Sequence, residues 1–529
     1  MNSEVYDVLN GQWKSTCKVL LGDEIGELGH FKDYLLGMSG QVVFRKGEKG
    51  GEIAFASGKY PKNARFASWQ DIDFGNKTIA ASANDLKDFD SLTRWAGENA
   101  VYAGDMVLGN SKYIERSPNI TDSFYVYESQ ASANSQYVAY SGYARFCESV
   151  FGSVMPGESS FCIRCNDTYK VKRAFELWMS VCSSDCYYVF NLTDCSDCMF
   201  SFNLRSKRHA IGNVELPRGE YLKTKDSLLS QMRDELVAKK KLPSLNNLIM
   251  QCPDRTAEVR KEISGKVLES AEEKKDFGAI DAAFSQTCSV LFGRGIGRLQ
   301  EYEGWLLENS RKGIVRKSAI SGKRVFMGNY ANYPSIPENR SVLENEGIAI
   351  AENVKPDADV RKASLENIPG IISKIAYLSL DYHDGMNHNI TDCFAYADSS
   401  NCLSCFPCVQ IKDSAYNFWP RSSSHLFGCS VVFDSSFCAR CSQSVKLTRC
   451  FEVDASRDCS DCYFCHNIEG CHECLFCFNA KSKRFAIGNA EYPKEEYLKI
   501  KKLILAEIAE KLEKNKTLDY GIYNIGCKK

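Results

Sequence analysis

Residues 450–477 read CFEVDASRDCSDCYFCHNIEGCHECLFC, and every cysteine in the stretch lies a multiple of three residues from the first. The same phase extends well beyond it. Of the 21 cysteines within residues 119–213 and 389–489, 20 share this phase, and only Cys182 departs from it. The backbone must therefore return every third side chain to one environment.

A longer period of 12 residues is superimposed, because Cys438, Cys450, Cys462 and Cys474 are equally spaced. An α-helix cannot hold this phase, since each three-residue step drifts by about 60°. Long 3₁₀ runs are uncommon, and collagen or polyproline II would need far more glycine or proline. We therefore expect a narrow β-solenoid of about 12 residues per coil, with every third side chain inside.

The chain is a tandem duplication. Three motifs recur in order: SSFCIRC at 159–165 and SSFCARC at 435–441, NLRSKRHAIGN at 203–213 and NAKSKRFAIGN at 479–489, and TCKVLLG at 16–22 and TCSVLFG at 287–293. The cysteine regions align without a gap, from Cys162 with Cys438 to Asn213 with Asn489. The halves lie near 1–245 and 276–529, and the charged, helix-prone segment 257–275 is expected to join them.

The expected fold class is α+β with a β-solenoid, in which each half has an α+β cap, a solenoid and a C-terminal amphipathic helix. The expected domains are the cap of half one at 1–118, solenoid one at 119–213, a helical connector at 214–275, the cap of half two at 276–388, solenoid two at 389–489, and the C-terminal helix and tail at 490–529. Helices are expected at 13–36, 221–240, 284–307 and 497–514.

The inward pattern resembles the beetle antifreeze proteins, whose right-handed β-helix has coils of the same length. The resemblance covers only the cysteine regions. The family's ice-binding face needs threonine on both sides of a cysteine, whereas Cys438 lies between Phe437 and Ala439, so ice binding is not implied. A second signature, CxxCxxxxNxxSKRxxIGN followed by ExPxxEYLK, is similar to uncharacterised cysteine-rich repeat proteins of phage and small-genome prokaryotes. That resemblance implies no established activity.

Zinc is the alternative to cysteine packing. Each half keeps two CxxC pairs at identical spacing, and two such pairs could form a tetrahedral thiolate site. The residues are Cys162, Cys165, Cys195 and Cys198 in half one, and Cys438, Cys441, Cys471 and Cys474 in half two. In a solenoid, however, the pairs lie about three coils apart, roughly 14 Å. Other cysteines are replaced in the sister half, as Cys465 is by Val189. We therefore expect buried fillers and no cofactor.

Oxidation could pair cysteines six residues apart as disulfides, but a reducing compartment favours free thiols. Residues 462–466, CYFCH, match a haem-attachment motif, and residues 293–297, GRGIG, mimic a phosphate loop. Neither pattern is kept in the sister half. His383 and His388 are expected in a turn or cap. The sequence isolates no catalytic set and no cofactor-binding set.

An apolar row follows the inward row by one residue and should point out of the coil. Its members are Tyr127, Phe151, Ile163, Phe175, Tyr187, Met199, Leu403, Phe427, Phe451, Tyr463 and Leu475. A row of this length is too large to leave in water. Either it packs on the amphipathic helix or the other half, or it forms a subunit interface.

Charge is balanced, with 66 Lys and Arg against 67 Asp and Glu, which disfavours a nucleic-acid binder. No signal peptide and no long apolar run is visible, so we expect a cytoplasmic or virion location and no membrane partner. The leading hypothesis is a non-enzymatic structural protein that binds copies of itself in a larger assembly, such as a virion or capsid component or an intracellular shell or lattice. The alternatives are a zinc-stabilised binding module and an enzyme with a site between the halves.

Overall fold

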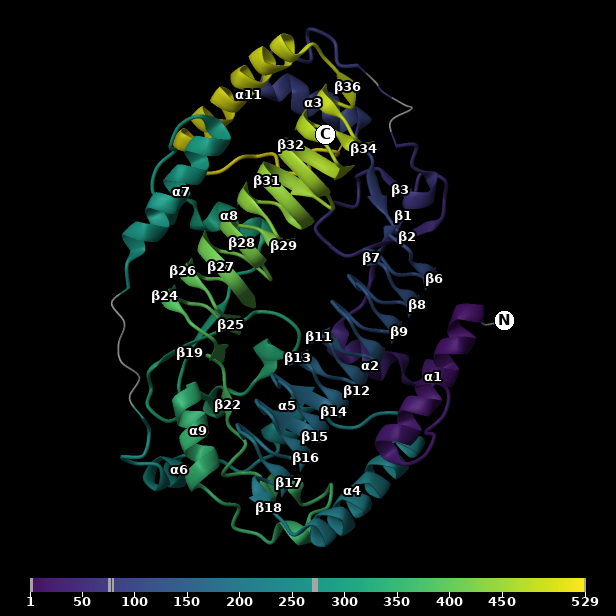
Figure 1. Ribbon diagram of the computed structural model, residues 1–529, viewed down its shortest axis with the longest axis vertical. Helices are drawn as coiled ribbons and strands as arrows, with labels where there is room; N and C mark the ends of the chain where they lie inside the picture. Colours follow the sequence, from purple (N-terminus) through teal and green to yellow (C-terminus); the bar gives the residue numbers. More distant parts are fainter. Residues whose placement is uncertain (1–2, 75–77, 79, 269–274, 528–529) are drawn as a thin grey trace.

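The structure is a computed structural model that describes residues 3–74, 78, 80–268 and 275–527. It is a mixed α and β fold. Eleven α-helices and 36 strands are assigned in the described residues, and most strands belong to one sheet of 12 strands and one of 14. Figure 1 shows the two sheets as two rows of short strands lying side by side.

The first stack (107–211) combines the 12-stranded sheet with the two-stranded sheet of residues 107–108 and 120–121, and its parallel strands pair mostly at a spacing of 12 residues along the chain. Val126 pairs with Val138, and Cys186 pairs with Cys198. Its strands are β5 (Val107–Leu108), β6 (Lys112–Glu115), β7 (Ile120–Thr121), β8 (Phe124–Tyr127), β9 (Gln136–Ala139), β10 (Glu148–Phe151), β11 (Val154–Gly157), β12 (Ser160–Ile163), β13 (Asn166–Tyr169), β14 (Lys172–Trp178), β15 (Ser184–Phe190), β16 (Ser196–Met199) and β17 (Arg208–Ile211).

The second stack (383–487) repeats this arrangement in the second half of the chain. Its strands are β23 (His383–Asp384), β24 (His388–Thr391), β25 (Tyr396–Ala397), β26 (Ser400–Leu403), β27 (Cys408–Ala415), β28 (Arg421–Phe427), β29 (Ser430–Phe433), β30 (Ser436–Ala439), β31 (Ser442–Asp454), β32 (Arg457–Glu469), β33 (His472–Leu475), β34 (Phe478–Lys481) and β35 (Arg484–Ile487). Each stack ends in a short antiparallel strand, β18 (Val214–Glu215) or β36 (Ala490–Glu491).

Both stacks begin earlier than the cysteine pattern predicts, at 107 and 383 rather than 119 and 389. The first coil of the first stack carries serine where later coils carry cysteine. The Ser111 and Ser117 hydroxyls accept hydrogen bonds from the backbone amides of Ser123 and Ser129, one coil later. Serine fits the same interior, so a search for cysteines alone missed these coils.

Every third residue of both stacks has a left-handed backbone conformation. The series runs from Tyr113 to His209 and from Asn389 to Phe485, with glycine at some positions and Pro407 as the only exception. Most members are not glycine, although this conformation costs a non-glycine residue about 1–2 kcal/mol. Each such residue lies at the bend between one inward-pointing residue and the next, and this repeated bend accounts for the conformation.

The inward side chains form hydrogen-bonded columns and do more than fill space. The Ser129 hydroxyl accepts the amide of Ser141 at 3.0 Å, and the Ser141 hydroxyl donates to the Ala139 carbonyl at 2.9 Å. Cysteine makes the same contact at a longer distance, because the Cys465 Sγ accepts a hydrogen bond from the Cys477 amide at 3.4 Å. These contacts satisfy backbone groups that strand pairing leaves free at the bends.

Three helices lie along the outer side of each stack, two long and one short (Figure 1). They are α1 (Glu4–Leu21), α2 (Lys32–Ser39) and α4 (Arg218–Lys239) on the first stack, and α7 (Phe277–Phe292), α8 (Glu303–Asn309) and α11 (Lys494–Asn515) on the second. The helices expected at 13–36 and 284–307 are each divided, because Gly22 and Gly293 end the first helix in a left-handed conformation. Residues 269–274 of the expected connector lie outside the described residues.

A buried ion pair attaches the second short helix to each stack. The Arg164 guanidinium contacts Glu176 and donates to the Tyr34 carbonyl in α2. Arg440 contacts Glu452 and donates to the Trp305 carbonyl in α8 in the same way. These two arginines and their two glutamates are at most 4% exposed. The pairing therefore fixes helix and stack together in both halves.

The middle segment of each expected cap packs on the stack formed by the other half of the chain. Residues 43–104, with β1 (Val43–Lys46), β2 (Glu52–Phe55), β3 (Phe66–Ser68), β4 (Tyr102–Gly104) and α3 (Phe89–Asn99), pack on the second stack. Residues 314–380, with β19 (Ile314–Lys317), β20 (Arg324–Met327), β21 (Ser341–Val342), β22 (Leu378–Ser379), α9 (Glu344–Asn353) and α10 (Ile368–Ile371), pack on the first, beside α5 (Leu245–Met250) and α6 (Thr256–Glu262).

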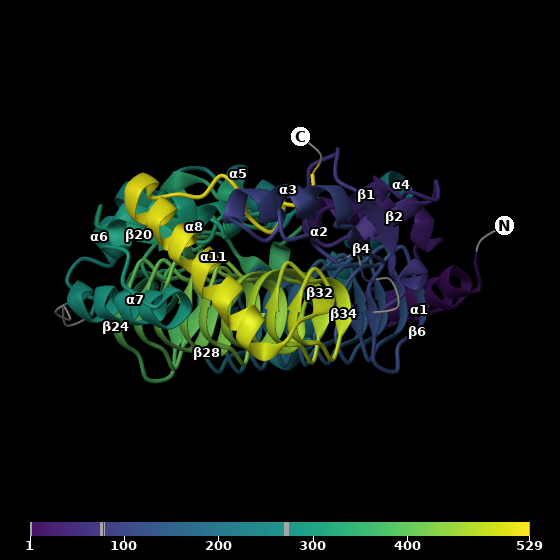
Figure 2. The same cartoon turned by 90° about the horizontal axis from the view of Figure 1, so that it is seen from above.

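Equivalent contacts close the end of each stack. The Asn479 amide donates to the Val101 carbonyl and the Asn203 amide to the Tyr377 carbonyl, both at 2.8 Å. Figure 2 shows α3, α5, β1 and β2 above the coils of the stacks. The expected caps at 1–118 and 276–388 are therefore each divided between the two stacks, because the end of a stack is covered by the other half.

Candidate ligand-binding cleft between the two stacks

The apolar row expected on the outside of the coils lies beneath helices of the same chain. Ten of its eleven members are buried, and Tyr127 is half-buried. The Tyr187 hydroxyl donates to the Leu20 carbonyl in α1, and the Tyr463 hydroxyl donates to the Leu291 carbonyl in α7. The row is therefore not available to a second subunit, because α1, α4, α7 and α11 already cover it.

The predicted zinc ligands are not brought together as four-cysteine sites. Cys162 pairs with Ala174, Ala174 with Cys186, and Cys186 with Cys198, so the two CxxC pairs of half one are three strand spacings apart. Half two has the same register. Within the described ranges there is no group of three or more His, Cys, Asp or Glu placed to hold a metal ion.

The remaining sequence motifs also lie away from any open site. Cys462 and Cys465 point into the second stack and are fully buried, and His466 is buried on its outer side. Residues 293–297 follow the end of α7 and do not join a strand to a helix. Cys182, the cysteine off the phase, is exposed at one of the bends.

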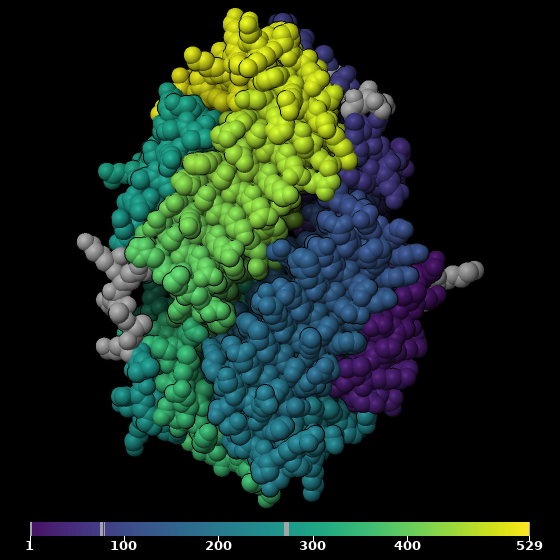
Figure 3. All heavy atoms as spheres, in the orientation of Figure 1, coloured from purple at the N-terminus to yellow at the C-terminus, as the bar shows by residue number. Residues whose placement is uncertain are grey.

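A cleft runs between the two stacks. In Figure 3 the blue and green stacks face one another across a furrow. Two adjoining chambers open along it. Chamber one, of about 250 Å³, lies towards Asn119 and Gln443, and chamber two, of about 390 Å³, lies towards Asp167 and Tyr396. Equivalent positions of the duplicated halves contribute to their walls, so the cleft carries the pseudo-two-fold relation of the two halves.

Two arginines and two aromatic residues stand where the chambers meet. Arg145 and Trp419 line both chambers, and Tyr143 and Arg421 line chamber two. The Tyr143 and Trp419 rings meet edge to face with centroids 4.7 Å apart. The Arg145 guanidinium lies 5.2 Å from the Phe433 ring, and the Arg421 guanidinium lies 5.9 Å from the Trp419 ring. Arg145 and Arg421 are equivalent under the duplication.

Neither guanidinium has a hydrogen bond or ion pair with another described residue. The Arg421 Nε is fully buried without a partner. Burial lowers the pKa of Arg421 to about 10, and the nearby charge of Arg145 acts in the same direction. By contrast, Arg173 makes two hydrogen bonds to Asp185, at 2.7 and 2.6 Å, on the outside of the first stack. Asp167 acts in the opposite direction on Arg421, and both arginine side chains are half-buried. The cleft therefore presents two positive charges without a hydrogen-bonded acceptor among the described residues.

A half-buried carboxyl group, that of Asp167, forms part of the wall of chamber two. Asp167 accepts hydrogen bonds from the Tyr330 and Tyr333 hydroxyls at 2.5 and 2.8 Å, both from the crossing segment 314–380. Burial raises its pKa to about 6, although the two hydroxyls and Arg421 act in the opposite direction. The wall therefore joins the first stack, the second stack and the crossing segment.

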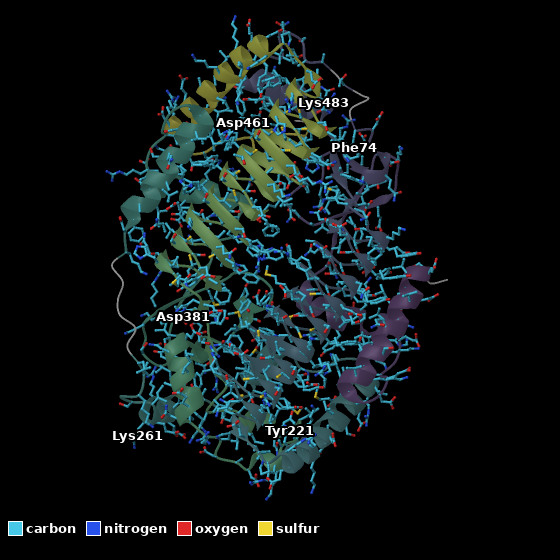
Figure 4. All side chains as sticks on the ribbon, in the orientation of Figure 1. Phe74, Tyr221, Lys261, Asp381, Asp461 and Lys483 are labelled. Carbon is cyan, nitrogen blue, oxygen red and sulfur yellow. The ribbon has the colours of Figure 1, made fainter. Side chains whose placement is uncertain are left out.

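A second group of titratable residues lies next to Tyr382 and Asp384, which line chamber two. His383 lies 3.1 Å from the Glu344 carboxylate, and that contact raises the pKa of His383 to about 9. Burial and the charge of Glu344 raise the pKa of Asp381 to about 7. In Figure 4 Asp381 lies beside the lower part of the second stack, whereas Tyr221 marks the start of α4. These residues tie β23 to α9 rather than forming the expected turn or cap.

Sequence reasoning did not single out Arg145 or Arg421. A signal was present, because the two arginines fall on the outward phase at equivalent positions, in GYARFC (142–147) and FWPRSS (418–423). None of the helices in the described ranges is both long and apolar enough to cross a membrane. No protein-family model, curated protein or solved structure matches the chain.

Proposed function

We propose that each stack is a narrow β-solenoid, and that the two solenoids form a rigid frame whose cleft binds an anionic small molecule. The parallel coil-to-coil register and the inward hydrogen-bonded columns support the first part. The reciprocal crossing of 43–104 and 314–380 supports the second, because it fixes the two stacks relative to each other. Binding accounts for the cleft without a bond-making step, so the proposed role is non-enzymatic.

The unpaired guanidiniums of Arg145 and Arg421 carry this proposal. Both side chains are half-buried, so the missing acceptors cost less than the several kcal/mol of a fully buried unpaired charge, but they leave donors of Arg145 and Arg421 free for a ligand. A bound phosphate or carboxylate would supply the missing acceptors, and arginine offers the planar pair of donors that suits them. The site is therefore expected to be less stable empty than filled.

The test is a thermal melt of the full chain with inorganic pyrophosphate as the anionic probe. Saturating pyrophosphate is expected to raise the melting temperature of the wild type by about 2 °C or more. The double variant R145Q/R421Q should lose that response. Without any anion it should be slightly more stable than the wild type, by about 1 kcal/mol or less, since two half-buried charges without hydrogen-bonded acceptors are gone.

The matched control is R173Q/R449Q, which removes two equivalent arginines that are paired with Asp185 and Asp461 outside the cleft. This control should keep the full response to pyrophosphate. An equal response in R145Q/R421Q and the wild type would place anion binding elsewhere and overturn the proposal.

A second candidate is the structural role in a larger assembly. It now depends on the exposed rim of chamber two, where Phe146 is 55% and Tyr169 is 41% exposed, so an assembly contact would close over the cleft. Native mass spectrometry of protein from its source tests it. Oligomers that are lost in F146S/Y169S would support an assembly, whereas a monomer at every concentration would contradict it.

A further inference from the structure

We infer that the ligand of the cleft is a dinucleotide-like molecule, in which two planar ring systems are joined through a central phosphate or pyrophosphate. This inference rests on the proposed function and goes further by naming the chemical class. It follows from the order of chemical groups along the cleft, which runs from aromatic to cationic to aromatic.

The centre of the cleft fits the phosphate. Arg145 and Arg421 come from equivalent positions of the two stacks, and Arg145 lines both chambers. A linking phosphate or pyrophosphate placed there would leave one end of the ligand in each chamber. The pseudo-two-fold relation of the site thus matches a ligand with two similar ends.

Each chamber has aromatic walls on which a base can stack. Chamber one is lined by Trp69 and Phe433 and chamber two by Tyr169 and Tyr396, while Trp419 lies at the junction of the two chambers. Stacking of a base on an aromatic side chain is typically worth about 1–3 kcal/mol. Two occupied chambers would therefore raise affinity well above that of the phosphate alone.

The polar groups of the two chambers differ, so each end of the ligand would make different hydrogen bonds. Amide side chains from Asn119, Gln443 and Asn467 line chamber one. Asn119 donates to Gln443 at 3.2 Å and Asn467 to Asn479 at 2.8 Å, which leaves further donor and acceptor positions on these amides for a ligand. Such amides can donate to and accept from the edge of a base. Chamber two instead presents the Asp167 carboxyl group and tyrosine hydroxyls. The amide-lined chamber is the one suited to a purine edge.

Calorimetric titration of the full chain tests the inference with three probes: diadenosine pyrophosphate, AMP and inorganic pyrophosphate. Diadenosine pyrophosphate is expected to bind at least tenfold more tightly than either smaller probe. Two variants then block one chamber each, A133F in chamber one and V409F in chamber two, at equivalent positions of the two stacks.

Each blocking variant should weaken diadenosine pyrophosphate binding at least tenfold, towards the affinity of AMP, and leave pyrophosphate binding unchanged. K172F, at an exposed lysine outside the cleft, is the matched control and should behave as the wild type. Melting temperatures report whether the variants fold, and A133Q and V409Q repeat the test with smaller side chains.

The outcomes separate this inference from the proposed function. If pyrophosphate binds as tightly as diadenosine pyrophosphate, or if blocking a chamber changes nothing, the inference is overturned while the anion site stands. If pyrophosphate does not bind at all, the proposed function fails. If pyrophosphate binds but diadenosine pyrophosphate does not, the ligand is an anion without planar ends, and the inference again fails.

Discussion

The two halves of the chain differ most clearly where the crossing segments meet the stacks. In half one, Trp178 and Phe190 are buried, and Trp178 contacts the Tyr333 ring at 6.0 Å. The equivalent positions in half two are Asp454 and His466. Asp454 accepts from the Tyr60 hydroxyl and from His466 Nδ1, and His466 Nε2 accepts from the Ala103 amide at 3.0 Å. One contact is apolar and the other is a buried polar network.

Other positions do not differ between the halves. Both keep the arginine–glutamate pair that fastens the second helix, both keep a glycine under that helix, and both keep one cleft arginine. The interior columns are conserved only in part, because many cysteines of half two correspond to serine, alanine or valine at the equivalent positions of half one. The frame and the cleft are therefore constrained, whereas the packing of the crossing segments can be rebuilt with different chemistry.

The greatest loss of stability is expected from breaking the arginine–glutamate pairs. E176A leaves the buried Arg164 guanidinium without its carboxylate, so it should lower the free energy of unfolding by about 3–5 kcal/mol. E452A should cost less, about 2–3 kcal/mol, because Arg440 keeps a 3.1 Å contact with Glu308. Urea denaturation measures the loss. The control E215A, in an exposed pair with Lys207, should cost about 0.5 kcal/mol or less. Losses below about 1 kcal/mol in E176A and E452A would show that the frame does not depend on these pairs.

The next largest loss of stability is expected from replacing the glycines beneath α2 and α8. A Cβ on Gly152 would lie 2.9 Å from the Leu35 Cα, and one on Gly428 would lie 2.7 Å from the Leu306 carbonyl oxygen. Both glycines also have positive φ, so G152A and G428A should each cost about 2–3 kcal/mol in urea denaturation. G470A is the control, because φ is positive but the nearest atom is 3.8 Å away. If all three cost the same, backbone conformation rather than the helix contact sets the constraint.

The buried polar network of half two should contribute less. D454A removes the acceptor of both Tyr60 and His466 and leaves two buried donors unpaired, at an expected cost of about 2 kcal/mol. Adding H466F, which copies the equivalent Phe190, should recover part of that loss. Chemical denaturation of the single and double variants measures both steps. Equal stability of wild type and D454A would show that this polar network is dispensable.

A smaller effect is expected from His383. Its pKa is raised, so the stabilisation is fully present below pH about 6.5 and is lost as pH rises through about 9. The side chain is partly exposed, so the contribution is about 0.5 kcal/mol. The difference in stability between wild type and H383Q should shrink across that pH range. A difference that stays constant from pH 6 to 9.5 would contradict the assignment.

Substitutions inside the stacks are also expected to have small effects. C477S and C459S copy Ser201 and Ser183 of half one, and the serine hydroxyl can make the same contact to the backbone as the thiol. Each should change the free energy of unfolding by about 1 kcal/mol or less. Melting in the presence of a zinc chelator should match melting in its absence. A large loss on chelation would restore zinc as a stabilising group.

The duplication, the 12-residue period and the positions that point inward could be predicted from the sequence, because a strict three-residue spacing of cysteines is compatible with few backbone conformations. The cysteines could be assigned to the interior by comparing Cys465 with Val189. The crossing of 43–104 and 314–380 could not be predicted, because apolar cap residues fit either stack equally well. Arg145 and Arg421 were missed for a related reason: their importance lies in the absence of a partner, which only the arrangement of the two stacks reveals.

The position of a bound oxyanion in a crystal would decide whether the cleft is an anion site. Crystals of the full chain soaked in tungstate would locate the anion by its anomalous scattering. We predict a peak between the Arg145 and Arg421 guanidiniums that is absent from crystals of R145Q/R421Q. Peaks only on the outer surface of the protein, with the cleft empty at saturating tungstate, would contradict the proposed function.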